Sequence, residues 1–282
     1  MSDSRPLAAD RLPGVFAVFC WEMRKLGKQK RTYIGMLVSI GLPIAFALSV
    51  AFSSQSRHGD IPFRSQDHAS GLAVPLVVLG FGSLFLLPLI AALVAGDIVS
   101  AEDHNGTLKT LLTMSVRRSQ VLAAKLAAAS AYAIAALIAA GVVGTVAGVL
   151  ASGFHPLVRL SGGEVSAAHA LVLVVASFAL FALPLLALAA IAFALSVFTR
   201  NSAAAIVGAT MLPLLLRIVP LLPHTDSLAP YLLQEQFSAW QGLWQSPIDW
   251  TVIVRSAWVS AGCAVPALAA AAFVFARRDV TG

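Results

Sequence analysis

"GDIVSAEDHNGTLKTLLTMSVRRSQVLAAK", residues 96–125, is the most polar long stretch of an otherwise apolar chain. It carries three acidic residues, two lysines and a pair of arginines between two apolar runs. Each flanking run is long enough to cross a bilayer as a helix, which requires about 20 apolar residues. A polar segment between two such runs predicts a connection that lies at a membrane surface.

The composition of the whole chain is that of an integral membrane protein. Of its 282 residues, 59% are hydrophobic and 11% are charged, whereas soluble domains have about 45–50% apolar and 25% charged residues. In lipid, backbone polar groups must be bonded within their own segment, so the apolar runs are expected to be helices. We therefore expect an all-α membrane protein with a single transmembrane domain over residues 1–282. Six runs qualify as spans: about 32–52, 72–98, 120–151, 167–198, 203–222 and 251–276.

Prolines within these runs predict kinks, because neighbouring helices can bond the carbonyls that a proline frees. Pro184 lies in the fourth run. The alternative, in which this run is split into two hairpin arms, is less favoured because neither arm would reach across the membrane.

The basic residues predict the orientation of the chain. With a cytoplasmic N-terminus, most of the 19 Lys and Arg residues, including every lysine, fall in inner segments. This positive-inside bias predicts a multi-pass protein of the cell membrane with both termini in the cytoplasm and residues 224–250 outside. The basic charge is then expected to face anionic lipid head groups. No pattern in the sequence indicates nucleic-acid binding.

Residues 1–31 are expected to form a cytoplasmic leader that ends in an interfacial helix. Residues 14–31, "GVFAVFCWEMRKLGKQKR", place apolar and basic residues at helical spacing. A helix of this kind lies in the membrane interface with its basic face on lipid phosphates, so membrane lipids are an expected partner. The alternative is a plain polar leader before the first span. The residues assigned to this helix are Trp21, Glu22, Arg24, Lys25, Lys28 and Arg31.

The sequence contains no pattern typical of a catalytic or metal-binding site. It has no G-x-S-x-G, H-E-x-x-H or G-x-x-x-x-G-K-[ST] motif, so neither hydrolase nor ATPase chemistry is expected in this chain. Its six histidines are spread singly, without the clusters that bind metals. An ion-coupled carrier is an alternative, but carriers place ionisable groups near mid-membrane. Asp97 is instead expected at the inner end of the second span, close to water or to a basic residue.

Residues 102–113 are expected to form a short amphipathic helix at the cytoplasmic surface. Leucines at i, i+3 and i+4 form an apolar stripe, which needs lipid or another protein as its partner. Carboxylates at its start suit the positive pole of a helix, and arginines after its end suit the negative pole. The residues assigned to this helix and its flanks are Glu102, Asp103, His104, Asn105, Gly106, Thr107, Leu108, Leu111, Leu112, Arg117 and Arg118.

A strip of glycines on the third span is a candidate packing surface. Gly141, Gly144 and Gly148 lie on one face, and the last two have the small-xxx-small spacing that allows close helix approach. This predicts packing on a helix of the same chain or of a second protomer. Glycine that is merely tolerated in an Ala-rich span is the alternative.

Residues 96–125 resemble the segment after the second span of ABC-2 type permeases, the membrane subunits of type V ABC exporters. "WEMRKLGKQKRTYIGM", residues 21–36, is similar to the connecting helix of that family. Ser115 departs from the pattern, since many relatives have proline there. The matching positions are Asp97, Ala101-Glu102, Gly106-Thr107-Leu108, Leu111-Leu112, Arg117 or Arg118, and Lys125.

The resemblance implies a partnership with a second permease copy or paralogue and with two separately encoded cytoplasmic ATPase subunits. ATP and Mg would be bound by the partner ATPase, while this chain would hold no cofactor and no catalytic residue. Residues 102–113 would be the coupling helix that docks on the ATPase. Residues 224–250 would be outer half-helices before the last span, with Trp240, Trp244 and Trp250 in an interface belt.

Spans so poor in charge favour a hydrophobic or amphipathic substrate, such as a drug, antibiotic, peptide or lipid. Export of such a substrate is the expected function. The alternative is an accessory subunit that relays ATPase motion to an extracytoplasmic system for the maturation of a metal or cofactor.

Overall fold

The computed structural model describes residues 14–53, 70–104, 117–158, 162–223, 225 and 227–277, and this part of the chain is mostly helical. The α-helices in chain order are α1 (Val15–Leu26), α2 (Lys30–Ser53), α3 (Ala73–Gly82), α4 (Leu86–Ala95), α5 (Ser100–His104), α7 (Arg118–Ser152), α8 (Ala167–Thr199), α9 (Ser202–Leu216), α10 (Leu233–Gln236) and α11 (Trp250–Ala276). The 3-10 helices are η1 (Val219–Leu221), η2 (Ala229–Tyr231) and η3 (Ala239–Trp244), and a two-stranded antiparallel ribbon pairs β1 (Leu157–Val158) with β2 (Glu164–Val165).

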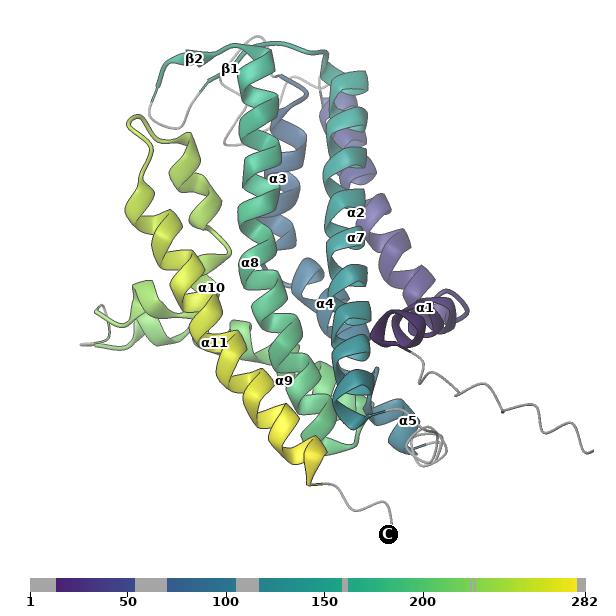
Figure 1. Ribbon diagram of the computed structural model, residues 1–282. Coiled ribbons are helices and arrows are strands. Elements are labelled where there is room, and N and C mark those ends of the chain that lie inside the picture. The colour runs from purple at the N-terminus through teal and green to yellow at the C-terminus, as the bar shows by residue number, and fades with distance from the viewer. Residues whose placement is uncertain are drawn as a thin grey trace, which may run out of the picture.

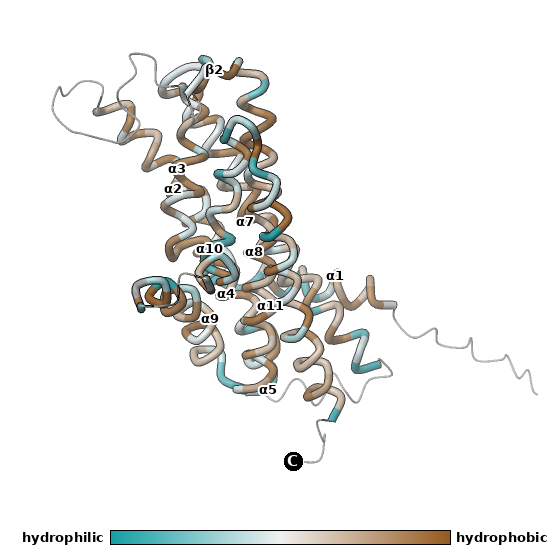
Figure 2. The backbone as a smooth tube through the Cα atoms, turned by 90° about the vertical axis from the view of Figure 1, so that its left-hand side faces the viewer, coloured by the Kyte–Doolittle hydropathy of each residue, from teal (hydrophilic) through white to brown (hydrophobic). Residues whose placement is uncertain are grey.

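Four of the described helices, α2, α7, α8 and α11, are long and apolar enough to cross a membrane. The chain is therefore an all-α, multi-pass membrane protein. With 35 and 33 residues, α7 and α8 are the longest elements, each about 50 Å long at a rise of 1.5 Å per residue. They run side by side and join at the β1–β2 ribbon (Figure 1). Figure 2 shows that hydrophobic residues predominate along the long helices.

The second predicted span is not one straight helix. The helices α3 and α4 pass the length test only as a pair, and they are bent by 62° at the break between them. Pro88 explains the position of this break, because it lacks the N–H that would bond to the carbonyl of Leu84. The expectation of a merely kinked span was therefore wrong here.

The fifth predicted span is shorter than expected. Only Ser202–Leu216 is α-helical, which is 15 residues or about 22 Å. The helix ends at Leu216 because Pro220, four residues later, has no N–H to donate to the Leu216 carbonyl. Short helical pieces follow as far as Trp244.

Residues 227–250, within the predicted outer half-helices, pack against α8. The ring of Phe237, just after α10, lies 5.2 Å from that of Phe181 near the middle of α8. Trp244 and Trp240 are buried, and Trp244 donates a 3.0 Å hydrogen bond from Nε1 to Ser177 Oγ of α8. Of the three tryptophans expected in an interface belt, only Trp250 is exposed. The other two were wrongly placed, because they fill the interior beside α8.

The glycine strip of α7 faces helices of the same chain. A Cβ on Gly148 would overlap the carbonyl oxygen of Gly71, next to α3, and one on Gly144 would lie 3.3 Å from Pro75 Cα. Gly141 approaches Phe178 of α8, where a Cβ would lie 2.9 Å from the ring. The absence of side chains thus lets α7 pack closely on α3 and α8.

Candidate functional site

The charged residues of the predicted interfacial helix and of residues 96–125 meet in one place. They lie near α1, α5 and the adjoining ends of α7 and α8 (Figure 1). This set is called the charge cluster below. Its members are Glu22, Lys25, Arg31, Asp97, Glu102, Asp103, Lys125 and Arg200.

Lys125 of α7 is the centre of the charge cluster. Its side chain is 0% exposed, and Nζ lies 2.7 Å from Glu22 Oε1, 2.7 Å from Glu102 Oε2 and 3.2 Å from the carbonyl oxygen of Ile98. An ammonium group has three protons to donate, and three acceptors surround this one. Lys125 therefore ties α7 to α1, to the end of α4 and to α5 in a single contact.

Glu22 owes its buried position to the helical spacing of α1. Val18, Glu22 and Leu26 are the buried residues of this helix, at i, i+4 and i+8, and this face packs on α7. Burial raises the pKa of the Glu22 carboxyl above its usual value, and the ammonium of Lys125 opposes that shift. The charged form of Glu22 thus depends on Lys125.

Glu102 of α5 is bridged between two lysines. Lys25 Nζ of α1 donates to Oε1 while Lys125 approaches Oε2, and the Glu102 side chain is 2% exposed. Together with Glu22, the group contains two carboxylates and two ammonium groups, so its formal charge is zero. Removal of one member would leave a buried charge without compensation, a change that costs about 3–5 kcal/mol.

Asp97 forms the next pair of the charge cluster. It follows α4, is 5% exposed at its side chain and forms a salt bridge with Arg31 of α2. The sequence suggested an inner-side basic residue as its neighbour, and Arg31 is that residue. This pair connects the start of the first span to the end of the second.

Three polar contacts fasten α5 to the junction of α8 and α9. Asp103 Oδ2 lies 3.5 Å from Arg200 Nε, and Arg200 ends α8 with a positive φ of 54°. The Ser196 Oγ of α8 accepts the backbone N–H of Ser100 at 3.0 Å, and the Ser100 hydroxyl lies 3.0 Å from that of Ser202. Ser100 and Ser196 are buried, and the Ser196 hydroxyl satisfies a backbone donor at the start of α5.

The structure describes only the first part of the predicted coupling helix. Glu102, Asp103 and His104 belong to α5, while six further residues of the prediction lie outside the described residues. These are Asn105, Gly106, Thr107, Leu108, Leu111 and Leu112. Glu102 was expected at the start of the coupling helix. In the structure its carboxylate is buried between Lys25 and Lys125 of the same chain, and its role in docking stays a prediction.

The arginine pair of the same prediction belongs to α7. Arg117 is its N-cap, and its backbone N–H donates to Gln120 Oε1 at 3.2 Å. Arg118 donates from a guanidinium nitrogen to the carbonyl oxygen of Ala276, the last residue of α11, at 3.2 Å. One observed role of this pair is therefore to join α7 to the C-terminal end of α11.

The residues assigned to the interfacial helix divide into two groups. Trp21, Arg24 and Lys28 are exposed, whereas Glu22 is buried in the charge cluster. Lys25 belongs to both groups, since it bonds to Glu102 and lies 5.5 Å from the ring centroid of Trp21. The exposed group has the aromatic and basic character of a helix that lies on a membrane interface.

Sequence reasoning missed the four residues that fasten α5 to α8 and α9. Ser100 and Ser196 are 96 residues apart, so no local spacing could relate them. Ser202 and Arg200 likewise carry no local signal of their role. Their one recognisable feature is that they are polar and lie next to apolar runs.

The charge cluster joins several helices at one junction, and comparisons with known proteins identify the family to which the chain belongs. The family described as "ABC-2 family transporter protein" matches residues 18–215, which includes the whole charge cluster. The chain belongs to the ABC-2 transporter family. It is therefore a membrane component of a transport system and not itself a catalytic subunit.

A relative supports the same assignment over a shorter stretch. The chain is similar to a protein described as "Probable ABC transporter permease protein NosY" from Stutzerimonas stutzeri, with 36% identity over 92 residues. This alignment covers 32% of the chain and 30% of that protein. The chain thus matches less than a third of the length of this curated relative.

Proposed function

We propose that this chain is the permease subunit of a type V ABC exporter, which moves a hydrophobic or amphipathic substrate outward. Energy would come from two separate cytoplasmic ATPase subunits, which bind ATP and Mg. A second permease copy or paralogue would complete the transmembrane pathway. In this proposal the chain crosses the membrane six times, with both termini in the cytoplasm. The broken second span and the short fifth span, continued by η3, count as two of these crossings.

The charge cluster is the observation that carries the proposal. A coupling segment must be attached to the spans that it moves, and α5 is attached to four helices at once. Lys25 and Lys125 bind it to α1 and α7, Ser196 and Arg200 bind it to α8, and Ser202 binds it to the start of α9. A displacement of residues 105–116 by an ATPase would therefore reach every one of these helices through direct side-chain contacts.

Packed, low-dielectric contacts suit this role because they resist deformation and shift as a unit. The two pairs that Lys125 forms with Glu22 and Glu102 are buried on both sides, so separating either one would leave an uncompensated charge at a large cost. The helices around α5 are thus expected to move together as one body when the ATPases close. The bend between α3 and α4 and the end of α9 are the places where this body would hinge.

The test is to separate docking from folding with two aspartate variants. In Leu111→Asp, the charged group falls on the apolar stripe expected to dock on the ATPase. Interface anchors of this kind contribute about 2 kcal/mol or more, so we expect about 30-fold weaker ATPase binding. The measurement is recovery of the ABC ATPase encoded beside the permease gene, pulled down by each purified variant.

Leu228→Asp is the matched control, because Leu228 is exposed and lies in the segment before the last span. It should recover as much ATPase as the unmodified chain. Undiminished recovery by Leu111→Asp would remove the coupling role from this segment. Glu102→Lys is not suitable for this test, because a third lysine beside Lys25 and Lys125 would destabilise the fold. A loss of ATPase recovery could then not be attributed to docking.

A further inference from the structure

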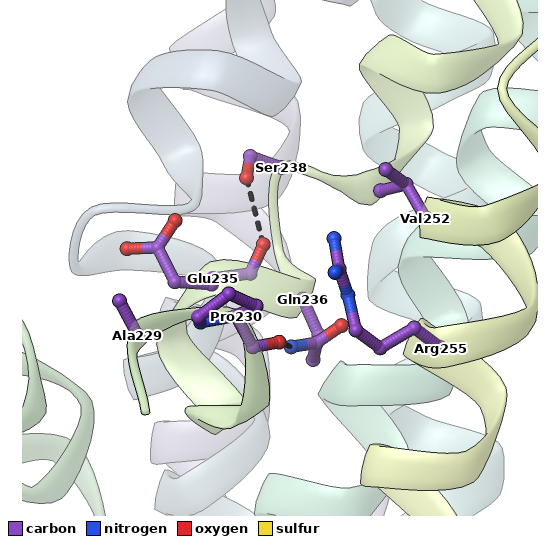
Figure 3. A pocket seen from close by; sticks show the side chains of 7 residues that line it. All are labelled: Ala229, Pro230, Glu235, Gln236, Ser238, Val252 and Arg255. Carbon is purple, nitrogen blue, oxygen red and sulfur yellow. Dashed lines mark hydrogen bonds between the residues drawn. The ribbon is translucent and has the colours of Figure 1, made fainter. Parts of the chain in front are cut away.

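A small polar pocket lies between the segment around α10 and the first turns of α11 (Figure 3). Its volume is about 210 Å³. It is called the Arg255 pocket below. Its lining residues are Ala229, Pro230, Glu235, Gln236, Ser238, Val252 and Arg255.

Arg255 has no salt bridge or hydrogen bond to its guanidinium within the described residues. Its Nε atom is buried and unbonded, and the group that acts on it electrostatically is Asp249, which caps the start of α11. The Asp249 carboxylate is already bonded to Thr251 and Val252. Arg255 as a whole is half-buried, and an ionisable residue in a membrane helix that lacks a partner indicates a functional site, because its desolvation is costly.

The other polar groups of the pocket are largely occupied. Gln236 Nε2 donates to the carbonyl oxygens of Pro230 at 2.8 Å and of Leu232 at 2.9 Å, which holds the η2–α10 turn in place. Ser238 Oγ donates to the carbonyl oxygen of Glu235 at 2.7 Å (Figure 3). The pocket therefore has a firm wall, and Arg255 is its uncommitted hydrogen-bond donor.

Glu235 supplies the opposite charge without neutralising Arg255. Its side chain is exposed, and its carboxylate forms no salt bridge within the described residues. Figure 3 shows this carboxylate and the Arg255 guanidinium on opposite sides of the view, with Pro230 and Gln236 between them. One pocket thus offers a cationic and an anionic group that do not satisfy each other.

We propose that the Arg255 pocket binds the head group of a zwitterionic amphiphile, with its phosphate on Arg255 and its amine on Glu235. The planar guanidinium fork matches the oxygens of a phosphate, and such charge-assisted bonds are the strong ones. Glu235 disfavours a second negative charge and suits an ammonium group. This proposal rests on the proposed export function and names the class of its substrate.

The surroundings of the pocket suit the apolar part of such a ligand. Val252, Pro230 and Ala229 contribute apolar wall. On α11, Val254 and Trp258 are exposed beside Arg255. Acyl chains would lie along this exposed face in the bilayer while the head group occupies the pocket. Free phosphate, which has no apolar part, would gain from Arg255 alone.

The test measures lipid binding to the purified full-length chain by native mass spectrometry. The probes are phosphatidylethanolamine, phosphatidylglycerol, which lacks the amine, and inorganic phosphate. We expect phosphatidylethanolamine to bind best. Arg255→Gln should weaken its binding about tenfold or more, the loss typical of a hydrogen bond between charged groups. Glu235→Gln should lower the preference for phosphatidylethanolamine over phosphatidylglycerol.

Arg217→Gln is the matched control, because Arg217 is exposed at the end of α9 and does not line the pocket. It should bind phosphatidylethanolamine as the unmodified chain does. If Arg255→Gln does not fold, Arg255→Lys should fold and retain most of the binding. If Arg255→Gln bound phosphatidylethanolamine as well as the unmodified chain, the proposal would be overturned. The same would follow if Arg255→Lys and Arg255→Met bound it equally well.

Two further results separate the possible explanations. Displacement of the lipid by equimolar inorganic phosphate would show a phosphate site and overturn the amphiphile. ATPase recovery is measured on the same preparations. If Leu111→Asp lowered ATPase recovery as expected but lipid binding did not depend on Arg255, only the pocket proposal would be refuted. If lipid binding depended on Arg255 but ATPase recovery did not respond to Leu111→Asp, only the coupling role would be refuted.

Discussion

The charge cluster and the Arg255 pocket differ in how their charged groups are paired. In the charge cluster, Lys125 has three acceptors within 3.2 Å and each carboxylate reaches a basic group. In the Arg255 pocket, Arg255 and Glu235 line the same 210 Å³ space without a salt bridge between them. Each charged group of the charge cluster has a group of opposite charge within the chain, whereas neither Arg255 nor Glu235 forms a salt bridge within the described residues.

This difference separates structural from functional charge in a membrane protein. A buried ion pair that is fully bonded serves to hold helices in register, at little net gain in stability but with a large penalty when one partner is lost. An arginine without a partner carries its cost in the resting state, and a ligand that pairs with it removes that cost. Mutations should therefore have opposite consequences in the two regions.

The largest effect is expected for Lys125→Met. The substitution preserves most of the side-chain volume but leaves the carboxylates of Glu22 and Glu102 buried without the ammonium group. The expected loss is about 3–5 kcal/mol in the free energy of unfolding, which is enough to abolish a folded, monodisperse protein. Thermal unfolding followed by size-exclusion chromatography measures it.

Lys28→Met is the control for this substitution, because Lys28 is exposed just after α1. It should leave the unfolding temperature unchanged within about 1 °C, as is usual for a surface substitution. If Lys125→Met were as stable as Lys28→Met, the charge cluster would not hold the helices together and the comparison would fail.

A smaller effect of the opposite kind is expected for Arg255→Gln. Because no described residue bonds to the Arg255 guanidinium, its removal breaks nothing, and the unfolding free energy should stay within about 1 kcal/mol or rise. Arg31→Gln is the matched arginine, since it breaks the salt bridge to Asp97 and should cost about 1–3 kcal/mol. Equal destabilisation by both variants would mean that Arg255 has a structural partner.

Much of this architecture could be predicted from the sequence because the signals are local. Hydropathy marks the long helices, and the spacing of apolar and basic residues marks α1. The polar stretch from residue 96 to 125 marks the segment that carries Asp97, Glu102 and Lys125. What its residues contact could not be predicted, since Lys125 and Glu22 are 103 positions apart.

The breaks in the second and fifth spans escaped prediction for a different reason. Pro88, Pro184 and Pro213 all lie inside apolar runs, yet α8 continues through Pro184 and the second span breaks before Pro88. Both outcomes are compatible with the local sequence, because neighbouring helices decide whether the freed carbonyls are bonded. The burial of Trp240 and Trp244 followed from the same unpredicted return of residues 224–250 toward α8.

The smallest effect on stability is expected at the edge of the charge cluster, for Arg200→Gly. Two terms oppose each other there. Arg200 adopts a positive φ of 54° at the end of α8, a conformation that costs a residue with a Cβ about 1–2 kcal/mol and glycine very little. Its 3.5 Å contact with Asp103 is more than half exposed on the arginine side, and such pairs contribute about 0–1 kcal/mol.

The unfolding temperature of Arg200→Gly should therefore stay the same or rise slightly, even though an ion pair of the charge cluster is lost. The coupling between the ATPase and the transmembrane helices should be weaker in this variant, because the lost pair joins α5 to the junction of α8 and α9. We expect ATPase recovery to be unchanged but stimulation of the ATPase by substrate to fall. Arg200→Lys keeps the charge and should retain that stimulation. A clear loss of stability in Arg200→Gly would contradict this prediction and would show that the Arg200–Asp103 pair holds the helices together as the Lys125 pairs do.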